Sequence, residues 1–333
     1  MKKLLFIGTL FFFINLNLFA QASGYRVTDT FHIPSPGWWD YLAVNNNKLY
    51  VSHGTQVNIL NENNGDSIGV IPNTTGVHGI AFVNSLNKGY TSNGGLNNVT
   101  VFNLSTNQIL GQIATGNDPD AIFYDDYSKR IITCNGRSQS LSVIDPKTDK
   151  VVYTIPLSGK PETAVSDGKG NVFVNIENKS AISKINIRTY KLEKTWPIAP
   201  GESPSGLSID RKTNRLFAGC DNKMLIVLND ETGKVVSTPT IGEGCDGTAF
   251  DPELRYVFSS NGEGTLTVIK EVSKDKFEVI DNVPTKRGAR TNALDIHTHT
   301  VYLPTADFGP RVNGERRPPM IPGSFQVLVV KRK

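Results

Sequence analysis

Residues 120–160 read DAIFYDDYSKRIITCNGRSQSLSVIDPKTDKVVYTIPLSGK, and this stretch decides the fold. Four short runs rich in β-branched and apolar residues occupy 121–124, 130–133, 140–144 and 150–155, with polar or Gly-bearing turns between them. Four such runs joined by tight turns predict one antiparallel sheet. The same layout returns at 205–244, so the chain holds an internal repeat of about forty residues. A four-stranded repeat of this length predicts a β-propeller, whose neighbouring blades bury each other's faces.

The start of the first strand recurs along the whole chain. Aligning the units on their second strands gives seven equivalent positions: Trp38, His78, Asp120, Glu162, Ser205, Asp246 and Arg290. Their spacings are 40, 42, 42, 43, 41 and 44 residues, which leaves no room for an inserted domain. We therefore predict an all-β fold, a seven-bladed propeller of four-stranded antiparallel blades that forms a single domain over residues 23–333.

The N-terminus has the pattern of an export signal. Lys2 and Lys3 precede an apolar run that begins at Leu4, and small residues follow at Ala20 and Ala22. This pattern predicts a signal peptide over residues 1–22, cleaved after Ala20 or Ala22. An N-terminal membrane anchor is the alternative. We favour export, so the expected location is periplasmic or extracellular.

The net charge of the chain indicates which kinds of partner to expect. The formal charge of +4 falls to +2 when the two lysines of residues 1–22 are removed. Such a balanced chain gives no reason to expect nucleic acid as a partner, and we expect a monomer.

The odd number of cysteines, Cys134, Cys220 and Cys245, leaves at least one thiol free, and we expect all three to be small buried thiols.

The second strands carry a recognisable motif. Tyr50-Val51-Ser52-His53, Tyr90-Thr91-Ser92-Asn93 and Phe258-Ser259-Ser260-Asn261 place an aromatic residue before small residues. At these residues the chain resembles the YVTN repeat β-propellers, and in particular the YncE-like proteins, over residues 25–333. Blade 4 departs from the motif with Asn175-Ile176. The resemblance implies the scaffold and leaves the function open, because such repeats define a fold.

The two ends of the chain are expected to complete one blade. The last unit has runs for three strands only, and the fourth is missing. Residues 25–33 precede the first unit and resemble the fourth strand at 150–155. We predict that they pair with the last unit and close the ring, because an unpaired edge would otherwise remain.

One face of the propeller is expected to collect two rings of side chains. The inner ring holds the first-strand positions given above, and the loops between second and third strands add His53, Asn93, Asn135, Glu177, Asp221, Asn261 and Asp307. Ordinary turns are also polar, so architecture is the alternative for any one member. The predicted ligand-binding residues are His78, Asp120, Glu162, Asp246, Arg290, Asn93, Asn135 and Asn261.

Blade 7 has the longest departure from the repeat, a Pro-rich loop between Asp307 and Phe325. Its Arg311, Arg316 and Arg317 are suited to holding a carboxylate or phosphate, and we add them to the predicted ligand-binding residues. These arginines and Arg290 are expected on one side of the channel mouth, across from the acids. A solvated basic loop is the alternative.

Other candidates carry less weight. A two-His metal site at His297 and His299 would lie on the opposite face, and Trp38-Trp39 would either stack on a sugar or pack at the channel mouth. No Gly-x-Ser-x-Gly, His-Glu-x-x-His, phosphate-loop or Cys-x-x-Cys motif occurs in the sequence.

Two function classes remain. We favour a non-catalytic exported propeller that binds a small anionic or polar ligand, a metal ion or a partner protein at the top face. The alternative is a hydrolase similar to propeller lactonases, in which acids at the channel mouth hold a divalent cation. Oxygen ligands such as Asp120, Glu162 and Asp246 would suit calcium better than zinc. The sequence names no cofactor.

Overall fold

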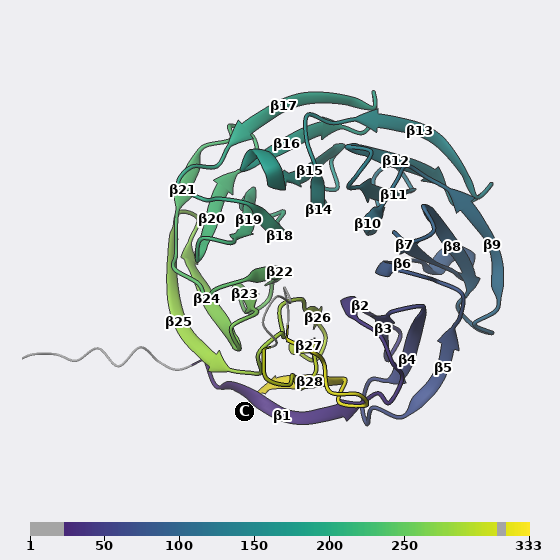
Figure 1. Ribbon diagram of the computed structural model, residues 1–333. Coiled ribbons are helices and arrows are strands. Elements are labelled where there is room, and N and C mark those ends of the chain that lie inside the picture. The colour runs from purple at the N-terminus through teal and green to yellow at the C-terminus, as the bar shows by residue number, and fades with distance from the viewer. Residues whose placement is uncertain (1–22, 312–317) are drawn as a thin grey trace, which may run out of the picture.

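Seven four-stranded sheets surround a central channel in the computed structural model, which describes residues 23–311 and 318–333 (Figure 1). Every paired strand is antiparallel to its neighbour, and in blades 1 to 6 the strands run from the channel outward in chain order. The seven-bladed, all-β prediction is confirmed. The predicted signal peptide at residues 1–22 lies outside the described residues, as do Arg316 and Arg317.

The first three blades follow the predicted repeat closely. Blade 1 consists of β2 (Trp39–Asn45), β3 (Lys48–His53), β4 (Gln56–Asn61) and β5 (Ser67–Ile71). Blade 2 consists of β6 (Val77–Val83), β7 (Lys88–Asn93), β8 (Asn98–Asn103) and β9 (Ile109–Ala114), with the short 3-10 helix η1 (Asn84–Leu86) after β6. Blade 3 consists of β10 (Pro119–Asp125), β11 (Arg130–Asn135), β12 (Ser140–Asp145) and β13 (Lys150–Pro156).

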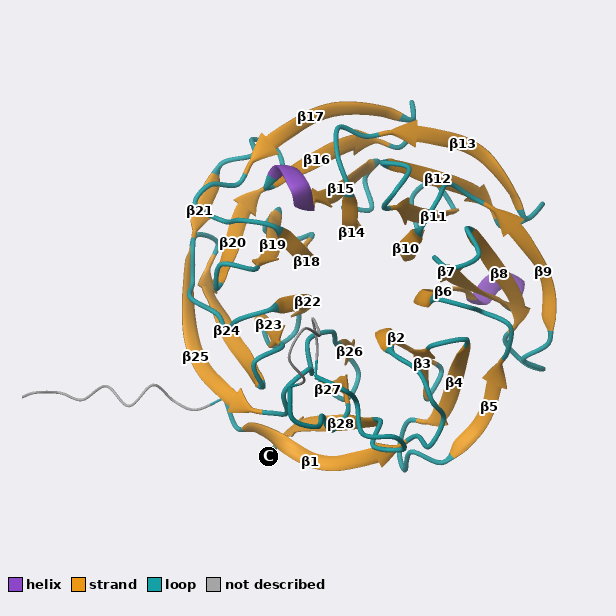
Figure 2. Ribbon diagram, viewed as in Figure 1, coloured by secondary structure: helices purple, strands orange, loops and turns teal. Residues whose placement is uncertain are grey.

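The remaining blades keep this order until the last. Blade 4 consists of β14 (Pro161–Ser166), β15 (Asn171–Ile176), β16 (Ala181–Asn186) and β17 (Lys191–Pro197), with η2 (Glu177–Lys179) after β15. Blade 5 consists of β18 (Pro204–Asp210), β19 (Arg215–Cys220), β20 (Met224–Asn229) and β21 (Val235–Ser237). Blade 6 consists of β22 (Cys245–Asp251), β23 (Tyr256–Asn261), β24 (Thr265–Ser273) and β25 (Lys276–Pro284). Figure 2 shows these strands as concentric layers around the channel.

Blade 7 is assembled from both ends of the chain. It consists of β26 (Ala293–Asp295), β27 (Thr300–Thr305), β28 (Gln326–Arg332) and, outermost, β1 (Tyr25–His32). β1 pairs with β28 from Tyr25 opposite Arg332 to His32 opposite Gln326 (Figure 1). The predicted closure is confirmed, and no edge of β28 is left unpaired.

The core lies between the blades. Among the described residues, each of seven apolar clusters joins one blade to the next, including the cluster that joins blade 7 to blade 1. The large side chain of each second strand is buried in these clusters: Tyr50, Tyr90, Ile132, Phe173, Phe217, Phe258 and Tyr302. Packing of this kind explains why no blade buries both of its faces by itself.

In blades 2, 4 and 6 the residue two positions after this large side chain ties its blade to the next. Ser92 donates a hydrogen bond to the backbone oxygen of Asp120, and Ser260 donates one to that of Arg290. In blade 4 the amide of Asn175 donates to the backbone oxygens of Ser205 and Gly206, at 2.9 and 3.0 Å. The departure of blade 4 from the sequence motif therefore preserves the contact that positions the inner ring.

Candidate functional site

In blades 1 to 6 the inner ring lies one residue inside the start of the first strand. Asp40, His78, Asp120, Glu162, Ser205 and Asp246 each follow the residue that pairs with the end of the second strand, and Arg290 takes the place in blade 7. The sequence alignment placed Trp38 in this ring, and the structure places Asp40 there. The reason is that Trp39, not Trp38, pairs with His53 and is buried against Phe325.

Two ring carboxylates, Asp40 from blade 1 and Asp120 from blade 3, converge on the imidazole of His78 in blade 2. His78 Nδ1 lies 2.6 Å from Asp40 Oδ2 and 3.7 Å from Asp120 Oδ1. Burial lowers the pKa of His78, but the hydrogen bond to Asp40 and the nearby carboxylates outweigh burial and raise it to about 9. Burial and the charge of Asp40 raise the pKa of Asp120 to about 7, against the opposing effect of His78. The imidazole is therefore a cation held between carboxylates at neutral pH.

Blade 4 adds a second cation. Lys160, in the loop before β14, places its Nζ 2.5 Å from Glu162 Oε1 and 2.6 Å from Glu177 Oε2. Burial and the charge of Asp120 raise the pKa of Glu162, while the Lys160 ammonium acts in the opposite direction. Lys160 thus bridges the inner ring and the loop ring of its own blade.

The third cation is Arg290, which lies between blades 6 and 7. Its Nε is 2.6 Å from Asp246 Oδ2, and Asp246 also accepts a hydrogen bond from Ser205. The Arg290 side chain remains 31 % exposed, so it faces the channel mouth while it is paired. Arg290 lines the same basin as Asp120 and Glu162, which come from blades 3 and 4.

Tyr41 forms the floor of the site. It follows the ring residue of blade 1, whereas the other blades carry small residues at this position: Gly79, Ala121, Thr163, Gly206, Gly247 and Thr291. A Cβ on Gly206 would lie 2.7 Å from the backbone nitrogen of Thr248, so the inner strands approach too closely there for larger side chains. Burial and the ring carboxylates raise the pKa of Tyr41, which keeps its phenol protonated.

These residues enclose a basin of about 320 Å³ at the channel mouth. Its lining comes from six blades and includes six carboxylates, Asp40, Asp120, Glu162, Glu177, Asp221 and Asp246, with two bases, Lys160 and Arg290. Burial and the neighbouring Asp246 and Glu177 raise the pKa of Asp221, which has no basic partner within the described part of the chain. The basin therefore combines an excess of acid with two fixed positive groups.

Three predicted site residues are directed into the blades instead. Asn93 donates to Asn98 and Thr100, at 2.8 and 2.9 Å, and is fully buried. Asn135 and Asn261 bind the corresponding third-strand hydroxyls in their own blades: Ser140, Ser142, Thr265 and Thr267. These asparagines hold the turn between the second and third strands, and the structure does not bring them to the basin.

An aromatic shelf adjoins the basin. Trp38, Trp39 and Phe308 surround a hollow of about 220 Å³ that shares Gly244 and Arg290 with the basin. The rings of Trp38 and Phe308 stack at 6.4 Å between centroids, and Trp38 is 46 % exposed. Arg311 is exposed, and the structure brings it to neither hollow among the described contacts.

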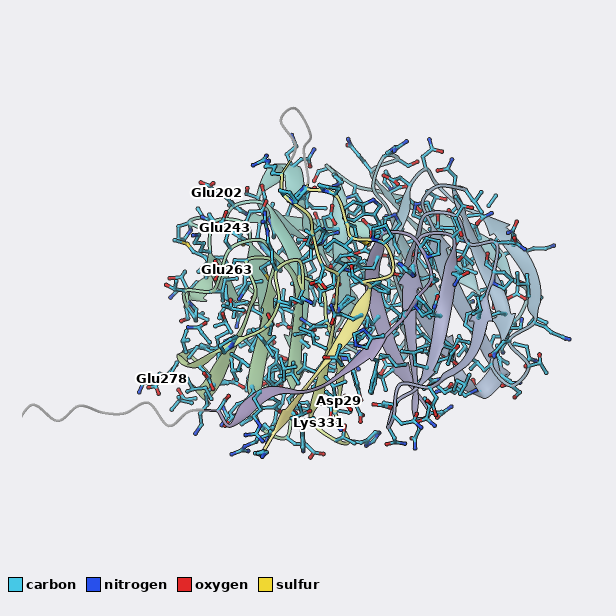
Figure 3. The ribbon with its side chains drawn as sticks, turned by 60° about the horizontal axis from the view of Figure 1, so that its bottom comes forward. Asp29, Glu202, Glu243, Glu263, Glu278 and Lys331 are labelled. Carbon is cyan, nitrogen blue, oxygen red and sulfur yellow. The ribbon has the colours of Figure 1, made fainter. Side chains whose placement is uncertain are left out.

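The remaining candidates lie elsewhere. His299, in the turn between β26 and β27 of blade 7, pairs with Asp251 of blade 6 at 2.7 Å, and His297 lines a separate hollow with Lys331. Figure 3 shows Lys331 and Asp29 at the bottom of the view, away from Glu202, Glu243 and Glu263, which lie higher on one side. Glu243 precedes Gly244, which lines the basin. Cys134, Cys220 and Cys245 are buried free thiols, which confirms that prediction.

The sequence reasoning missed Asp40, Tyr41 and Lys160. The signal for Asp40 and Tyr41 was present, because His53 ends the second strand of blade 1 as Asn93 ends that of blade 2, and counting back across the pairing gives Trp39 and then Asp40. Lys160 stands two residues before Glu162, and no sequence pattern indicates that it bridges to Glu177.

Comparison with known proteins supports the fold. No family model matches the chain, and no curated protein matches it. Among solved structures, the hydrazine synthase of Kuenenia stuttgartiensis superposes with a TM-score of 0.71 at 14 % identity, covering 81 % of this chain and 92 % of that one. The chain has the β-propeller fold that this structure contains. At 14 % identity the similarity does not indicate a shared function. Among the described residues, no helix has the length and apolar content to cross a bilayer.

Proposed function

We propose that this chain is an exported propeller of the YVTN, YncE-like kind that binds a small polar ligand in the basin at its channel mouth. The observation that carries the proposal is the lining of the basin, in which Arg290 and Lys160 stand among six carboxylates. A simple anion would be repelled, because carboxylates outnumber basic groups in the lining of the basin. A ligand with both an acidic and a cationic group can pair with Arg290 and with unpaired acid such as Asp221.

The location of the charges favours a binding role over a structural one. Ion pairs that only join blades can lie anywhere along the interfaces, yet these charged groups converge on one cavity from six blades. Their backbones are fixed by contacts between blades, as for Asp120 and Arg290, so the site is formed before a ligand arrives. Preformed sites of this size suit small molecules.

The test is a thermal-shift screen of the purified protein against zwitterions, simple anions and simple cations of matched size, followed by calorimetry. We expect zwitterions to bind best. Arg290→Ala should weaken binding by about 1.5 to 3 kcal/mol, the range for hydrogen bonds to charged groups, with little change in melting temperature. The matched control is Arg211→Ala, which removes a different interblade arginine pair, with Asp126 at 2.9 Å.

Two results would count against this function. One is an absence of any preference for zwitterions over the two simple classes. The other is an equal loss of affinity in Arg290→Ala and Arg211→Ala, since Arg211 does not line the basin and neither do its partners, Asp126 and Ser166.

A metal-dependent hydrolase similar to propeller lactonases is the second candidate. The observation that favours it is the group formed by Asp40, His78 and Asp120, whose ligand atoms all lie within 4.8 Å of one another. Turnover of aryl esters or sugar lactones that requires added metal, and that disappears in Asp120→Ala or Glu162→Ala, would establish it over simple binding.

A further inference from the structure

The ligand atoms of Asp40, His78 and Asp120 are arranged as three neighbouring corners of a coordination shell. They all lie within 4.8 Å of one another, and His78 Nδ1 is 2.6 Å from Asp40 Oδ2. Ligands about 2.1 Å from a common ion lie about 3 to 4 Å apart, so small side-chain adjustments would bring all three onto one cation. The three residues come from blades 1, 2 and 3.

The backbone around this group is held in place. Ser92 accepts a hydrogen bond from the backbone nitrogen of Gly79 at 2.9 Å and donates one to the backbone oxygen of Asp120. Ser52 accepts from the backbone nitrogen of Asp40 at 3.0 Å. Two serines therefore fix the peptides that carry all three ligands, which is the rigid support that a metal site needs.

A second observation indicates a missing partner. Asp120 Oδ1 is a buried atom, and it has no hydrogen-bond partner among the described residues. It also lies 3.7 Å from His78 Nδ1, too far for a hydrogen bond to that nitrogen. A buried carboxylate oxygen without a hydrogen bond is costly, and a metal ion that replaces the Nδ1 proton of His78 would coordinate this oxygen directly.

The donor set selects the kind of cation. One imidazole nitrogen and two carboxylate oxygens suit divalent first-row transition metals such as Mn²⁺, Co²⁺ and Zn²⁺, whereas Ca²⁺ takes oxygen ligands alone. The sequence grouped Asp120 with Glu162 and Asp246 and so favoured calcium. In the structure His78 is the neighbour of Asp120, and Glu162 is paired with Lys160.

We propose that Asp40, His78 and Asp120 bind one divalent transition-metal ion in the wall of the basin. Asp40 and Asp120 also line the basin, so coordination positions left open by the protein face the ligand. The metal would then receive a carboxylate or carbonyl oxygen of that ligand. This last step rests on the proposed binding function, while metal binding by itself does not.

The test uses the purified protein stripped with a chelator and titrated with Mn²⁺, Co²⁺, Zn²⁺ or Ca²⁺ alone by calorimetry, with visible absorption of bound Co²⁺ as a second readout. We expect one transition-metal ion per chain and weaker Ca²⁺ binding. His78→Ala and Asp120→Asn should each lower affinity more than about 100-fold, since the first removes a direct ligand and the second removes the negative charge of one. Melting curves of both variants establish that they are folded.

The matched control is His299→Ala. His299 also pairs with an aspartate, Asp251, at 2.7 Å and has a second acid, Glu253, at 3.6 Å, but it lies outside the basin. This variant should keep full affinity for the ion that the wild-type protein binds.

Absence of stoichiometric transition-metal binding, or binding unchanged by both His78→Ala and Asp120→Asn, would overturn the metal site. Zwitterion binding by the stripped protein would in that case leave the proposed function standing. Metal binding without any zwitterion binding would instead support the metal site and count against the proposed function.

Discussion

The phenol oxygen of Tyr41 on blade 1 lies 3.5 Å from the hydroxyl oxygen of Thr163 on blade 4, so one side chain spans the channel. The small residues at the equivalent position of the other blades leave the space that this side chain fills. Tyr41 therefore separates the charged basin from the channel below it and limits the depth to which a ligand can enter.

Replacing Tyr41 tests this role. Tyr41→Ala should lower the free energy of unfolding by about 2 to 4 kcal/mol, because it removes a large side chain from the channel and leaves a cavity. Tyr41→Phe keeps the ring and loses only a long polar contact, so we expect a cost below about 1 kcal/mol. Denaturant unfolding of both variants gives the comparison. Equal stability of Tyr41→Ala and the wild type would show that the ring contributes nothing to the fold.

His53 should make the fold sensitive to acid. It is fully buried, stacks on Phe325 at 3.9 Å between centroids, and contacts Ser35 and the backbone oxygen of Gly37 at 2.7 and 2.8 Å. Burial lowers its pKa to about 4. Because the folded-state pKa is below the unfolded value, stability is full above about pH 6.5 and falls as the pH drops toward 4, by about 3 kcal/mol.

The variant for this prediction is His53→Asn, which installs the residue that blades 2, 3 and 6 carry at the same position. Unfolding should be measured from pH 8 to pH 4 in both proteins. The difference in the free energy of unfolding between wild type and His53→Asn should change by about 3 kcal/mol in favour of the variant as the pH falls from 8 to 4. A difference that stays constant with pH would contradict the assignment.

Asp230 is expected to destabilise the protein at neutral pH. It is buried after β20, and its Oδ1 has no hydrogen-bond partner among the described residues. Burial and the charge of Asp167 raise its pKa to about 6. A carboxyl whose folded-state pKa is raised stabilises the fold less as the pH rises, and the loss is complete above pH 6.

Asp230→Asn should therefore unfold at higher denaturant concentration than the wild type at pH 7.5, with a gain of about 1 to 3 kcal/mol. The gain should disappear near pH 4, where the wild-type carboxyl is protonated in the folded state. Asp126→Asn is the control, because Asp126 is exposed and paired with Arg211. A destabilised Asp230→Asn at pH 7.5 would show that the carboxylate has a favourable partner.

The closing strand should be required for stability. Removing residues 23–33 would expose β28 along its whole length and remove Tyr25, Phe31 and Ile33 from two of the apolar clusters. We expect the melting temperature to fall by more than about 10 °C relative to a chain that begins at Ser23, with aggregation through the open edge. Identical melting temperatures of the two chains would show that β1 contributes little to the stability of blade 7.

The fold was predictable from the sequence because its signal repeats seven times. An error at one position, such as Trp38 in place of Asp40, leaves the blade count unchanged. The site was less predictable because each member is decided by its own surroundings. Asn93 ends its second strand and bonds inward to Thr100, whereas Glu177 lies one position beyond the equivalent residue, Ile176, and reaches Lys160.

Residues that act across the ring are the hardest to predict. Tyr41 and Thr163 are more than a hundred positions apart, and only the closed ring brings them together. The repeat gives the order of the blades around the axis. It does not give the length to which one side chain extends over the channel, which depends on the small residues of the other six blades.

The pairing of β1 with β28 also places the two ends of the described chain side by side, where the backbone nitrogen of Lys333 donates to the oxygen of Gly24 at 3.1 Å. A short linker could join them without crossing the structure, and new termini could be opened in any loop between blades. The protein is thus suited to circular permutation, with seven alternative starting points. It also follows that β1 stays without its partner during synthesis until β28 has been made, so the ring closes late.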